Sequence, residues 1–201
     1  TIRQDEQLPV YERLGDVRSR AVTMGKIADI LMARGQLDQA LTIRQDEQLP
    51  VYERLGDVRS RAVTMGKIAD ILMARGQLDQ ALTILKEEML PAFERLGDIE
   101  GIAAVRFKCV QILLAKEGLT EQNAQKILED LQEIFAILQK LGHADGLVGV
   151  GLLFGKVLAD CDESEWALSV LEIAAGAAEK LERGDYLAKI QTLQKTLQDR
   201  P

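Results

Sequence analysis

The sequence predicts an all-α fold, an α-solenoid of stacked antiparallel helical hairpins. The first observation is an internal repeat: residues 1–41 recur unchanged as residues 42–82, a diverged copy begins at Thr83, and a fainter fourth copy aligns with the second from Leu141 onwards. The second is the apolar spacing within a copy, which follows helical steps of three and four residues. The third is a composition with only 4% aromatic residues, which favours helix over strand. Because one hairpin cannot bury its apolar face alone, neighbouring hairpins must stack.

Each repeat is predicted to form two helices joined by a short loop. In the second copy, Asp57 is a good cap for the first helix, and Gly76 ends that helix. The apolar stripe of the first helix consists of Val58, Ala62, Met65, Ala69 and Leu72. A second helix is expected from near Gln77 to Leu96, just before Gly97. We therefore divide a single solenoid, residues 1–201, into the second helix of a truncated unit (1–15), four hairpins (16–56, 57–97, 98–142 and 143–184) and a C-terminal capping helix (185–201).

A proline recurs inside the predicted second helices, as Pro9, Pro50 and Pro91. Proline lacks an amide donor and clashes with the carbonyl of the preceding turn, so we expect a kink or short break at each site. Such a break could act as a hinge or as a fixed bend that sets the superhelical pitch. The pattern favours the fixed bend.

The charge distribution argues against nucleic-acid binding. The chain has 25 basic and 32 acidic residues, and residues 83–201 carry the whole net charge of −7, so that half should prefer basic partners. The longest uncharged run near the end, Gly146–Gly155, is too short to span a membrane. Cys109 and Cys161 are expected to be free thiols in the cytoplasm. The absence of an initiating Met and of a signal peptide indicates a fragment or an edited sequence.

Particular positions of the repeat carry a likeness to a known family. In the first copy these are Met24, Ile27-Ala28, Leu31, Gly35, Leu37 and Ala40-Leu41. The second copy repeats them, and Phe154-Gly155 in the fourth copy nearly reproduces the family's Leu-Gly pair. On these residues the chain resembles the tetratricopeptide repeat (TPR) family, in its longer variety of about forty residues per unit. The resemblance implies a right-handed superhelix that binds peptides or partner domains in a concave groove lined by first helices, and that is rarely an enzyme.

The resemblance also implies which residues face the groove. They are Val22, Lys26, Asp29 and Met32 in the first copy, Val63, Lys67, Asp70 and Met73 in the second, and Lys108, Gln111, Leu152 and Lys156 in the later copies. Chaperone-tail binders of this family clamp a terminal carboxylate with Lys and Asn. Here Asp or Gln stands three residues after each of the lysines Lys26, Lys67 and Lys108, so such a clamp is not expected. A solvated face of weak ion pairs is the alternative interpretation of these rows.

Other motifs point to packing more than to chemistry. Gly149–Gly151 with Gly155 is similar to a dinucleotide-binding fingerprint, but it falls within a predicted helix and not after a strand, so close helix packing is expected. His143, the only histidine, is expected to cap a helix, and alone it offers no multi-histidine metal site or paired nucleophile. Cys109 is expected in the core. Trp166 either packs against the final helix or forms an exposed binding anchor.

Two functional hypotheses follow. The leading one is a non-enzymatic scaffold that holds a protein or peptide partner of unknown identity in the groove. The alternative is self-association, because residues 1–15 match only a second helix and leave a stacking face that another copy could cover, end to end or by hairpin exchange. No motif indicates an enzyme, a cofactor or a metal. The two identical copies indicate a recent duplication or a deliberate repetition, and the sequence leaves both open.

Overall fold

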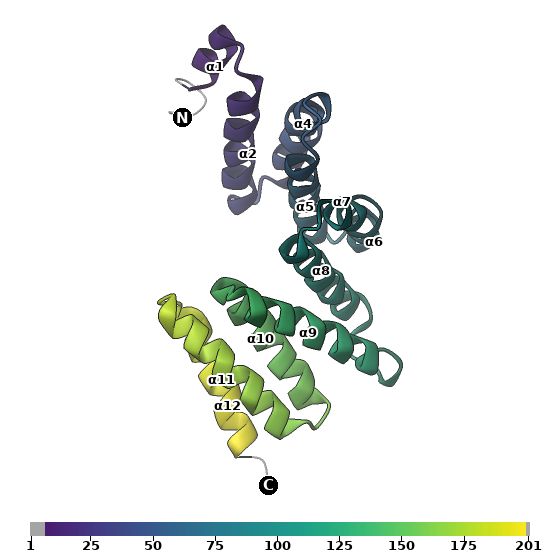
Figure 1. Cartoon of the computed structure of the whole chain (residues 1–201), viewed down its shortest axis with the longest axis vertical. Helices are drawn as coiled ribbons and strands as arrows, with labels where there is room; N and C mark the ends of the chain where they lie inside the picture. The colour runs from purple at the N-terminus through teal and green to yellow at the C-terminus, as the bar shows by residue number, and fades with distance from the viewer. Residues whose placement is uncertain (1–6, 200–201) are drawn as a thin grey trace. The chain divides into compact units, whose positions relative to one another are not determined.

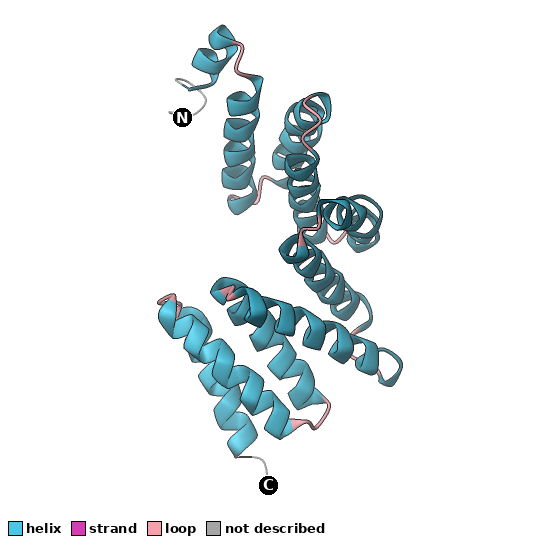
Figure 2. Cartoon of the chain, viewed as in Figure 1, coloured by secondary structure: helices cyan, strands magenta, loops and turns pink. Residues whose placement is uncertain are grey.

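The computed structural model describes residues 7–199, and its contacts divide the chain into two compact units, Thr1–Asp98 and Ile99–Pro201 (Figure 1). Every regular element in the described range is helical (Figure 2). The prediction of an all-α class built from helical hairpins is therefore confirmed. The single solenoid over residues 1–201, its superhelical winding and its division into units stay predictions.

The N-terminal unit contains the two identical copies and the start of the third. Its helices are α1 (Leu8–Leu14), α2 (Val17–Ala33), α3 (Leu37–Thr42), η2 (Ile43–Gln48), α4 (Leu49–Arg54), α5 (Val58–Ala74), α6 (Leu78–Thr83), η3 (Ile84–Met89) and α7 (Leu90–Leu96). Helices α2 and α5 are the first helices of their repeats, and each packs against the helical segments that follow it. Of the predicted truncated unit at residues 1–15, α1 is described and residues 1–6 lie outside the described range.

The C-terminal unit is built from longer and more regular helices. They are α8 (Ile99–Glu117), α9 (Glu121–Leu141), α10 (Ala144–Asp160), α11 (Ser164–Lys180) and α12 (Gly184–Gln198). Helix α10 lies between α9 and α11, and α12 packs on α11 and α10. The predicted capping helix corresponds to α12, although residues 200–201 lie outside the described range.

The predicted caps occur where the sequence places them. The Asp57 carboxylate accepts a hydrogen bond from the Ser60 amide at 3.0 Å, which satisfies a free donor in the first turn of α5 and lowers the pKa of Asp57. The ring of His143 caps α10 in the same way, because its Nδ1 accepts from the Gly146 amide at 2.9 Å. Gly97 ends α7 with φ of 62°, a left-handed conformation that glycine adopts without strain.

At Pro50 and Pro91 the expected break takes the form of a π-helical segment, and the residues before Pro9 lie largely outside the described range. Segment η2 precedes Pro50 and η3 precedes Pro91, so each proline falls in the first turn of the α-helix that follows. The Leu49 amide donates to the Arg44 carbonyl, five residues back, instead of four. Buried side chains from both segments pack on the preceding first helix, as expected of a fixed bend.

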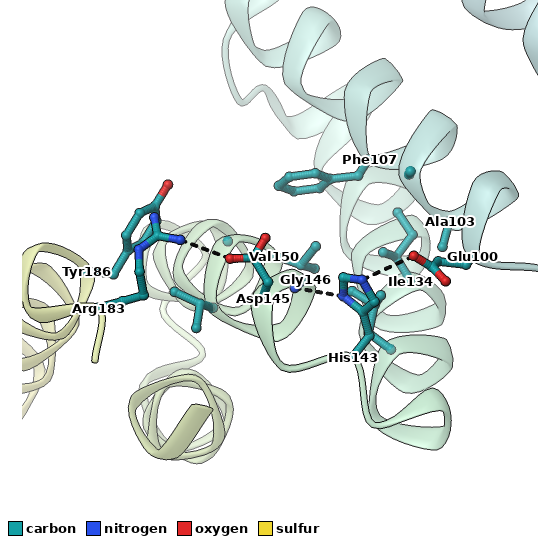
Figure 3. Close-up of a pocket in the computed structure, with 14 residues that line it drawn as sticks. Glu100, Ala103, Phe107, Ile134, His143, Asp145, Gly146, Val150, Arg183 and Tyr186 are labelled. Carbon is teal, nitrogen blue, oxygen red and sulfur yellow. Dashed lines mark hydrogen bonds and ion pairs between the residues drawn. The ribbon is translucent and has the colours of Figure 1, made fainter. Parts of the chain in front are cut away.

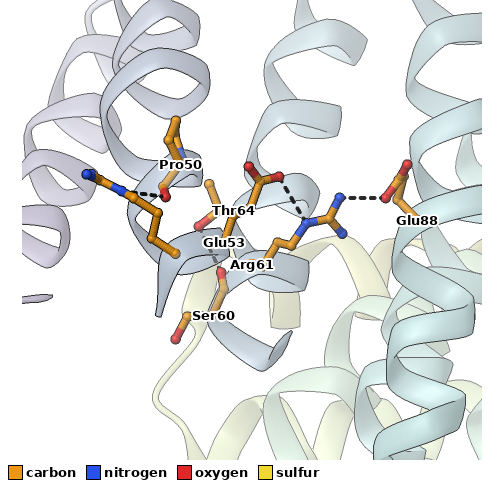
Figure 4. A network of polar contacts seen from close by, with 7 residues as sticks. Pro50, Glu53, Ser60, Arg61, Thr64 and Glu88 are labelled. Atoms are coloured by element: carbon orange, nitrogen blue, oxygen red, sulfur yellow. Dashed lines mark hydrogen bonds and ion pairs between the residues drawn. The ribbon is translucent and has the colours of Figure 1, made fainter. Parts of the chain in front are cut away.

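A repeated arginine ties each hairpin of the N-terminal unit together (Figure 4). The guanidinium of Arg61 on α5 donates to Glu53 of α4 at 3.2 Å and to Glu88 of η3 at 2.8 Å. These hydrogen bonds, that to Glu88 foremost, raise the pKa of Arg61. Arg20 makes the same two contacts one copy earlier. Because these groups are partly exposed, each pair contributes modestly, and its main effect is to fix the hairpin geometry.

The core of the C-terminal unit is centred on α10. Two of its glycines sit where neighbouring helices come close: a Cβ at Gly151 would lie 2.7 Å from the Ala174 Cβ, and one at Gly155 would lie 2.6 Å from the Leu171 side chain. The dinucleotide-like motif is thus a helix-packing feature, as expected. Gly149 differs from these two, because nothing lies within 4 Å of its absent Cβ.

The glycines of α10 give a matched stability test. Gly149→Ala should raise the free energy of unfolding by about 1 kcal/mol, because alanine favours helix and meets no neighbour. Gly151→Ala should lower it, because the new methyl overpacks the contact with α11, at about 1–3 kcal/mol. Urea unfolding followed by the fluorescence of the single tryptophan measures both changes. Equal shifts in the same direction would contradict this packing.

Two single-residue expectations are corrected or refined by the structure. Cys109 is only half-buried, so it is not a fully enclosed core thiol. Trp166 does pack, and the aromatic partner of its ring is Phe154 of α10, in an edge-to-face arrangement with centroids 5.4 Å apart. The indole remains 38% exposed, because it starts α11 at the edge of the helix layer.

Candidate functional sites

The face formed by α2 and α5 carries an open pocket of about 310 Å³, here called the N-terminal pocket. It is lined by Val22, Gly25, Lys26, Asp29, Arg44, Gln48, Tyr52, Arg59, Ser60, Val63, Thr64 and Lys67. Five of the predicted groove residues are among them: Val22, Lys26, Asp29, Val63 and Lys67. The structure therefore brings equivalent residues of the two identical copies to one surface.

A buried polar cluster forms the base of the N-terminal pocket. The Arg44 side chain is only 5% exposed, and it donates to Asp29 and to Gln48, each at 2.6 Å. Burial lowers the pKa of Arg44, and the neighbouring carboxylate of Asp29 opposes that shift. Gly25 makes room for the cluster, because a Cβ there would lie 2.4 Å from the Gln48 side chain.

The sequence reasoning missed Arg44 and Gln48, which belong to the π-helical segment and not to a first helix. The third copy has Leu85 and Met89 at the equivalent positions, which was the available signal that these sites are inward-facing. Asp29 does not fit the alternative interpretation, a solvated face of weak ion pairs between the lysines and aspartates of the repeat. Its ion-pair partner is the buried Arg44 and not a neighbouring lysine.

The positive charge of the N-terminal pocket is only partly compensated. Lys26 and Lys67 are both exposed, and neither forms an ion pair with another residue in the range 7–199. Arg59 pairs with Asp98 at 2.9 Å. The remaining predicted residues of this unit, Met32, Asp70 and Met73, are half-buried and lie outside the pocket lining.

The C-terminal unit has its own pocket of about 280 Å³, here called the C-terminal pocket. It is lined by Glu100, Ala103, Ala104 and Phe107 of α8, Ile134 and Leu138 of α9, His143, Asp145, Gly146, Val148, Gly149 and Val150 at the start of α10, and Arg183 and Tyr186 at the start of α12. Small and apolar side chains make most of this surface. Gly149 adds bare backbone, which deepens the pocket.

Two polar pairs flank the C-terminal pocket (Figure 3). On one side, Nε2 of His143 lies 3.1 Å from Glu100. On the other, Arg183 donates to Asp145 at 2.9 Å and its guanidinium lies 4.5 Å from the centre of the Tyr186 ring. Because Nδ1 of His143 accepts the Gly146 amide, Nε2 is the ring nitrogen that remains to face Glu100.

The predicted groove residues of this unit lie farther along the same helices. Gln111 follows Phe107 by four residues on α8, and Leu152 follows Gly149 by three on α10. Lys156 is exposed and Lys108 is half-buried, and none of the four lines the C-terminal pocket. Sequence reasoning missed the charged side walls because it assigned His143 to helix capping alone and the last helix to a terminal cap of the solenoid.

Comparison with known proteins identifies the fold. BtubC from P. vanneervenii superposes with a TM-score of 0.76 at 16% identity, over 94% of this chain and 78% of that one. A putative kinesin light chain from Podosopora anserina with nearly identical TPR-like repeats gives 0.59 at 16% identity, over 90% and 98%. The chain has a TPR-like fold. No protein-family model and no curated protein sequence matches it.

Two Rap protein structures are similar in fold to this chain. Apo RapI gives a TM-score of 0.73 at 16% identity over 89% of this chain, which spans 63% of RapI. A Rap protein complexed with competence and sporulation factor gives 0.71 at 15% identity, over 89% and 51%. At these identities the likeness concerns the fold, and the repeat length of 41 residues stays a prediction.

Metal-binding clusters and membrane-spanning helices are absent from the described part of the chain. Between residues 7 and 199, no group of three or more His, Cys, Asp or Glu side chains could hold a metal ion. In the same range, no helix has the length and apolar character needed to cross a bilayer.

Proposed function

We propose that this TPR-like chain is a non-enzymatic interaction module that binds a peptide or partner domain on the face formed by its first helices. The observation that carries the proposal is the N-terminal pocket, where Val22 and Val63 are 41% and 49% exposed beside the exposed Lys26 and Lys67. Exposed apolar side chains at such a surface supply contact area, and the lysines orient a ligand with carboxylates. We also place the chain in the cytoplasm, in keeping with its two free thiols.

The remaining predicted groove residues extend the proposed surface. Met32 and Met73 would widen the apolar contact, since methionine adapts to varied ligands. Asp70, Lys108, Gln111, Leu152 and Lys156 would contact the flanking parts of a longer ligand. The Rap protein complexed with competence and sporulation factor supports the general mode, because it has the same fold with a factor bound.

The test uses a library of random peptides displayed on phage and selected on the immobilised full chain. Enriched peptides are synthesised and their affinity is measured for the unmodified chain and for the Lys26→Glu/Lys67→Glu variant. We expect peptides rich in Asp and Glu, and at least about a tenfold loss of affinity in the variant, because two attractive charges become repulsive.

The control variant is Lys86→Glu/Lys140→Glu, which makes the same change in net charge at exposed lysines of second helices. It should bind the selected peptides as the unmodified chain does. Equal binding by the Lys26→Glu/Lys67→Glu variant, or equal losses in both variants, would overturn the groove proposal. Circular dichroism confirms that all variants are folded.

A second candidate function, self-association, is favoured by a comparison between the identical copies. Val10 is 39% exposed whereas its counterpart Val51 is 5% exposed, and Ile30 is 40% exposed whereas Ile71 is 1% exposed. In the second copy these side chains are covered by packing within the N-terminal unit. The same apolar surface on the first copy is therefore a stacking face, and we propose a second copy of the chain as its occupant.

Light scattering over a wide concentration range tests self-association. Val10→Asp/Ile30→Asp should reduce the mass of any assembly to that of one chain. Val17→Asp/Val58→Asp is the matched control, because these equivalent residues are 47% and 43% exposed and so lie outside the stacking face. A constant mass of 22.3 kDa for the unmodified chain would exclude this candidate.

A further inference from the structure

The C-terminal pocket combines an apolar floor with a bare stretch of backbone. Ala103 and Phe107 of α8 face Val150 of α10 across it (Figure 3). Gly149 contributes no side chain, and the space where its Cβ would lie is open. At about 280 Å³ the pocket lies just below the usual size of small-molecule sites, which suits one large side chain of a ligand.

The charges at the rim of this pocket are unequal. Arg183 neutralises Asp145 through their ion pair. Glu100 faces Nε2 of His143, and no Lys or Arg of the pocket lining pairs with it. The Glu100 side chain is 57% exposed and therefore open to a ligand. An apolar pocket with an exposed carboxylate at its edge complements an apolar side chain next to a cation.

We propose that the C-terminal pocket anchors one apolar side chain of a peptide, with an adjacent Lys or Arg of that peptide directed at Glu100. This deepens the proposed interaction function and rests on it. The N-terminal pocket favours carboxylates and the C-terminal pocket favours a cation, so the two units select different segments of a partner. The surplus of acidic residues in 83–201 agrees with this preference.

The test is a titration of the ¹⁵N-labelled full chain with N-acetyl-leucyl-arginine amide, followed by NMR. We expect a dissociation constant on the order of 1–10 mM for so small a ligand, with shifts centred on the Phe107 and Tyr186 amides. N-acetyl-alanyl-arginine amide should bind about tenfold more weakly, because it leaves the pocket unfilled. N-acetyl-leucyl-glutamate amide should bind about two- to fivefold more weakly than the arginine probe.

Gly149→Leu should fill the pocket and weaken the binding of the leucyl-arginine probe at least about tenfold. Gly176→Leu is the matched control on α11, since its absent Cβ also meets nothing within 4 Å and it lines none of the described pockets. Glu100→Gln should remove the preference for arginine over glutamate and retain the preference for leucine over alanine.

Shifts centred away from the pocket, or equal binding by the Gly149→Leu and Gly176→Leu variants, would overturn the inference. The acidic peptides selected through Lys26 and Lys67 separate the two proposals, because they should bind the Gly149→Leu variant normally. If they do so while the dipeptide fails to bind, the anchor proposal is wrong and the proposed function stands. If no selected peptide depends on the lysines, the proposed function fails first.

Discussion

Ile71→Ala should lower the free energy of unfolding by about 2–5 kcal/mol, whereas Ile30→Ala should lower it by less than about 1 kcal/mol. The two residues occupy the same position of identical repeats. Ile71 is 1% exposed and packs with Ala28 and Ala40 of the preceding copy, while Ile30 is 40% exposed. Truncation at Ile71 therefore leaves a cavity, and truncation at Ile30 removes atoms that already contact water.

Urea unfolding followed by far-UV circular dichroism measures both variants, and the fluorescence of Trp166 shows whether the C-terminal unit is affected. We expect the tryptophan signal to be unchanged by either substitution. Because the local sequence is the same at both sites, helix propensity cancels in the comparison. Equal destabilisation by the two substitutions would mean that the first copy is covered as fully as the second, which would also remove the basis for self-association.

Arg44→Leu/Gln48→Met should raise the free energy of unfolding by about 1–4 kcal/mol, because it replaces a buried guanidinium and a buried amide by well-packed apolar side chains. The Asp29 carboxylate that Arg44 leaves behind is 51% exposed and stays hydrated. The third copy already has this pair as Leu85 and Met89, and Met89 packs against Gly66 as Gln48 packs against Gly25. The Nε atom of Arg44 is buried without a hydrogen-bond partner, which adds to the cost of the polar cluster.

The single variant Arg44→Ala separates polarity from packing. It leaves a cavity and takes the partner of the buried Gln48 away, so it should lower the free energy of unfolding by about 1–3 kcal/mol. Chemical denaturation of the full chain compares it with the double variant. A double variant less stable than the unmodified chain would show that the Arg44–Asp29 pair is a net stabilising contact.

Much of the fold follows from the sequence because its signals are local. The caps at Asp57 and His143 and the glycine at the end of α7 each depend on a few neighbouring residues, and each occurs as predicted. The proline break was expected, but its π-helical form was not, because a missing amide donor can be accommodated in several ways. Half-burial of Cys109 depends on contacts with other helices, which helical periodicity alone does not fix.

The candidate sites were less predictable. Repetition identified the exposed positions of α2 and α5 correctly enough to include Val22 and Lys26 of the N-terminal pocket. Arg44 was missed because a charged residue is normally assigned to the solvent-exposed surface, and the sequence does not show that Arg44 pairs with Asp29. Predicting the C-terminal pocket would have required knowing that the start of α12 lies beside α10. This arrangement brings Arg183 to Asp145, 38 residues away in the sequence. No local pattern encodes such a contact.

The buried Arg44 has a consequence for how an array of this kind could grow. Each further insertion of the same 41-residue unit would create one more junction in which an arginine and a glutamine meet a glycine of the preceding helix. The apolar junction made by Leu85 and Met89 would still occur only once, where the identical units meet the diverged copy. Each added unit would therefore contribute less to the stability of the array than the junction made by Leu85 and Met89 does. A longer array would be more stable if the arginine and the glutamine were replaced by apolar residues before the unit is duplicated further.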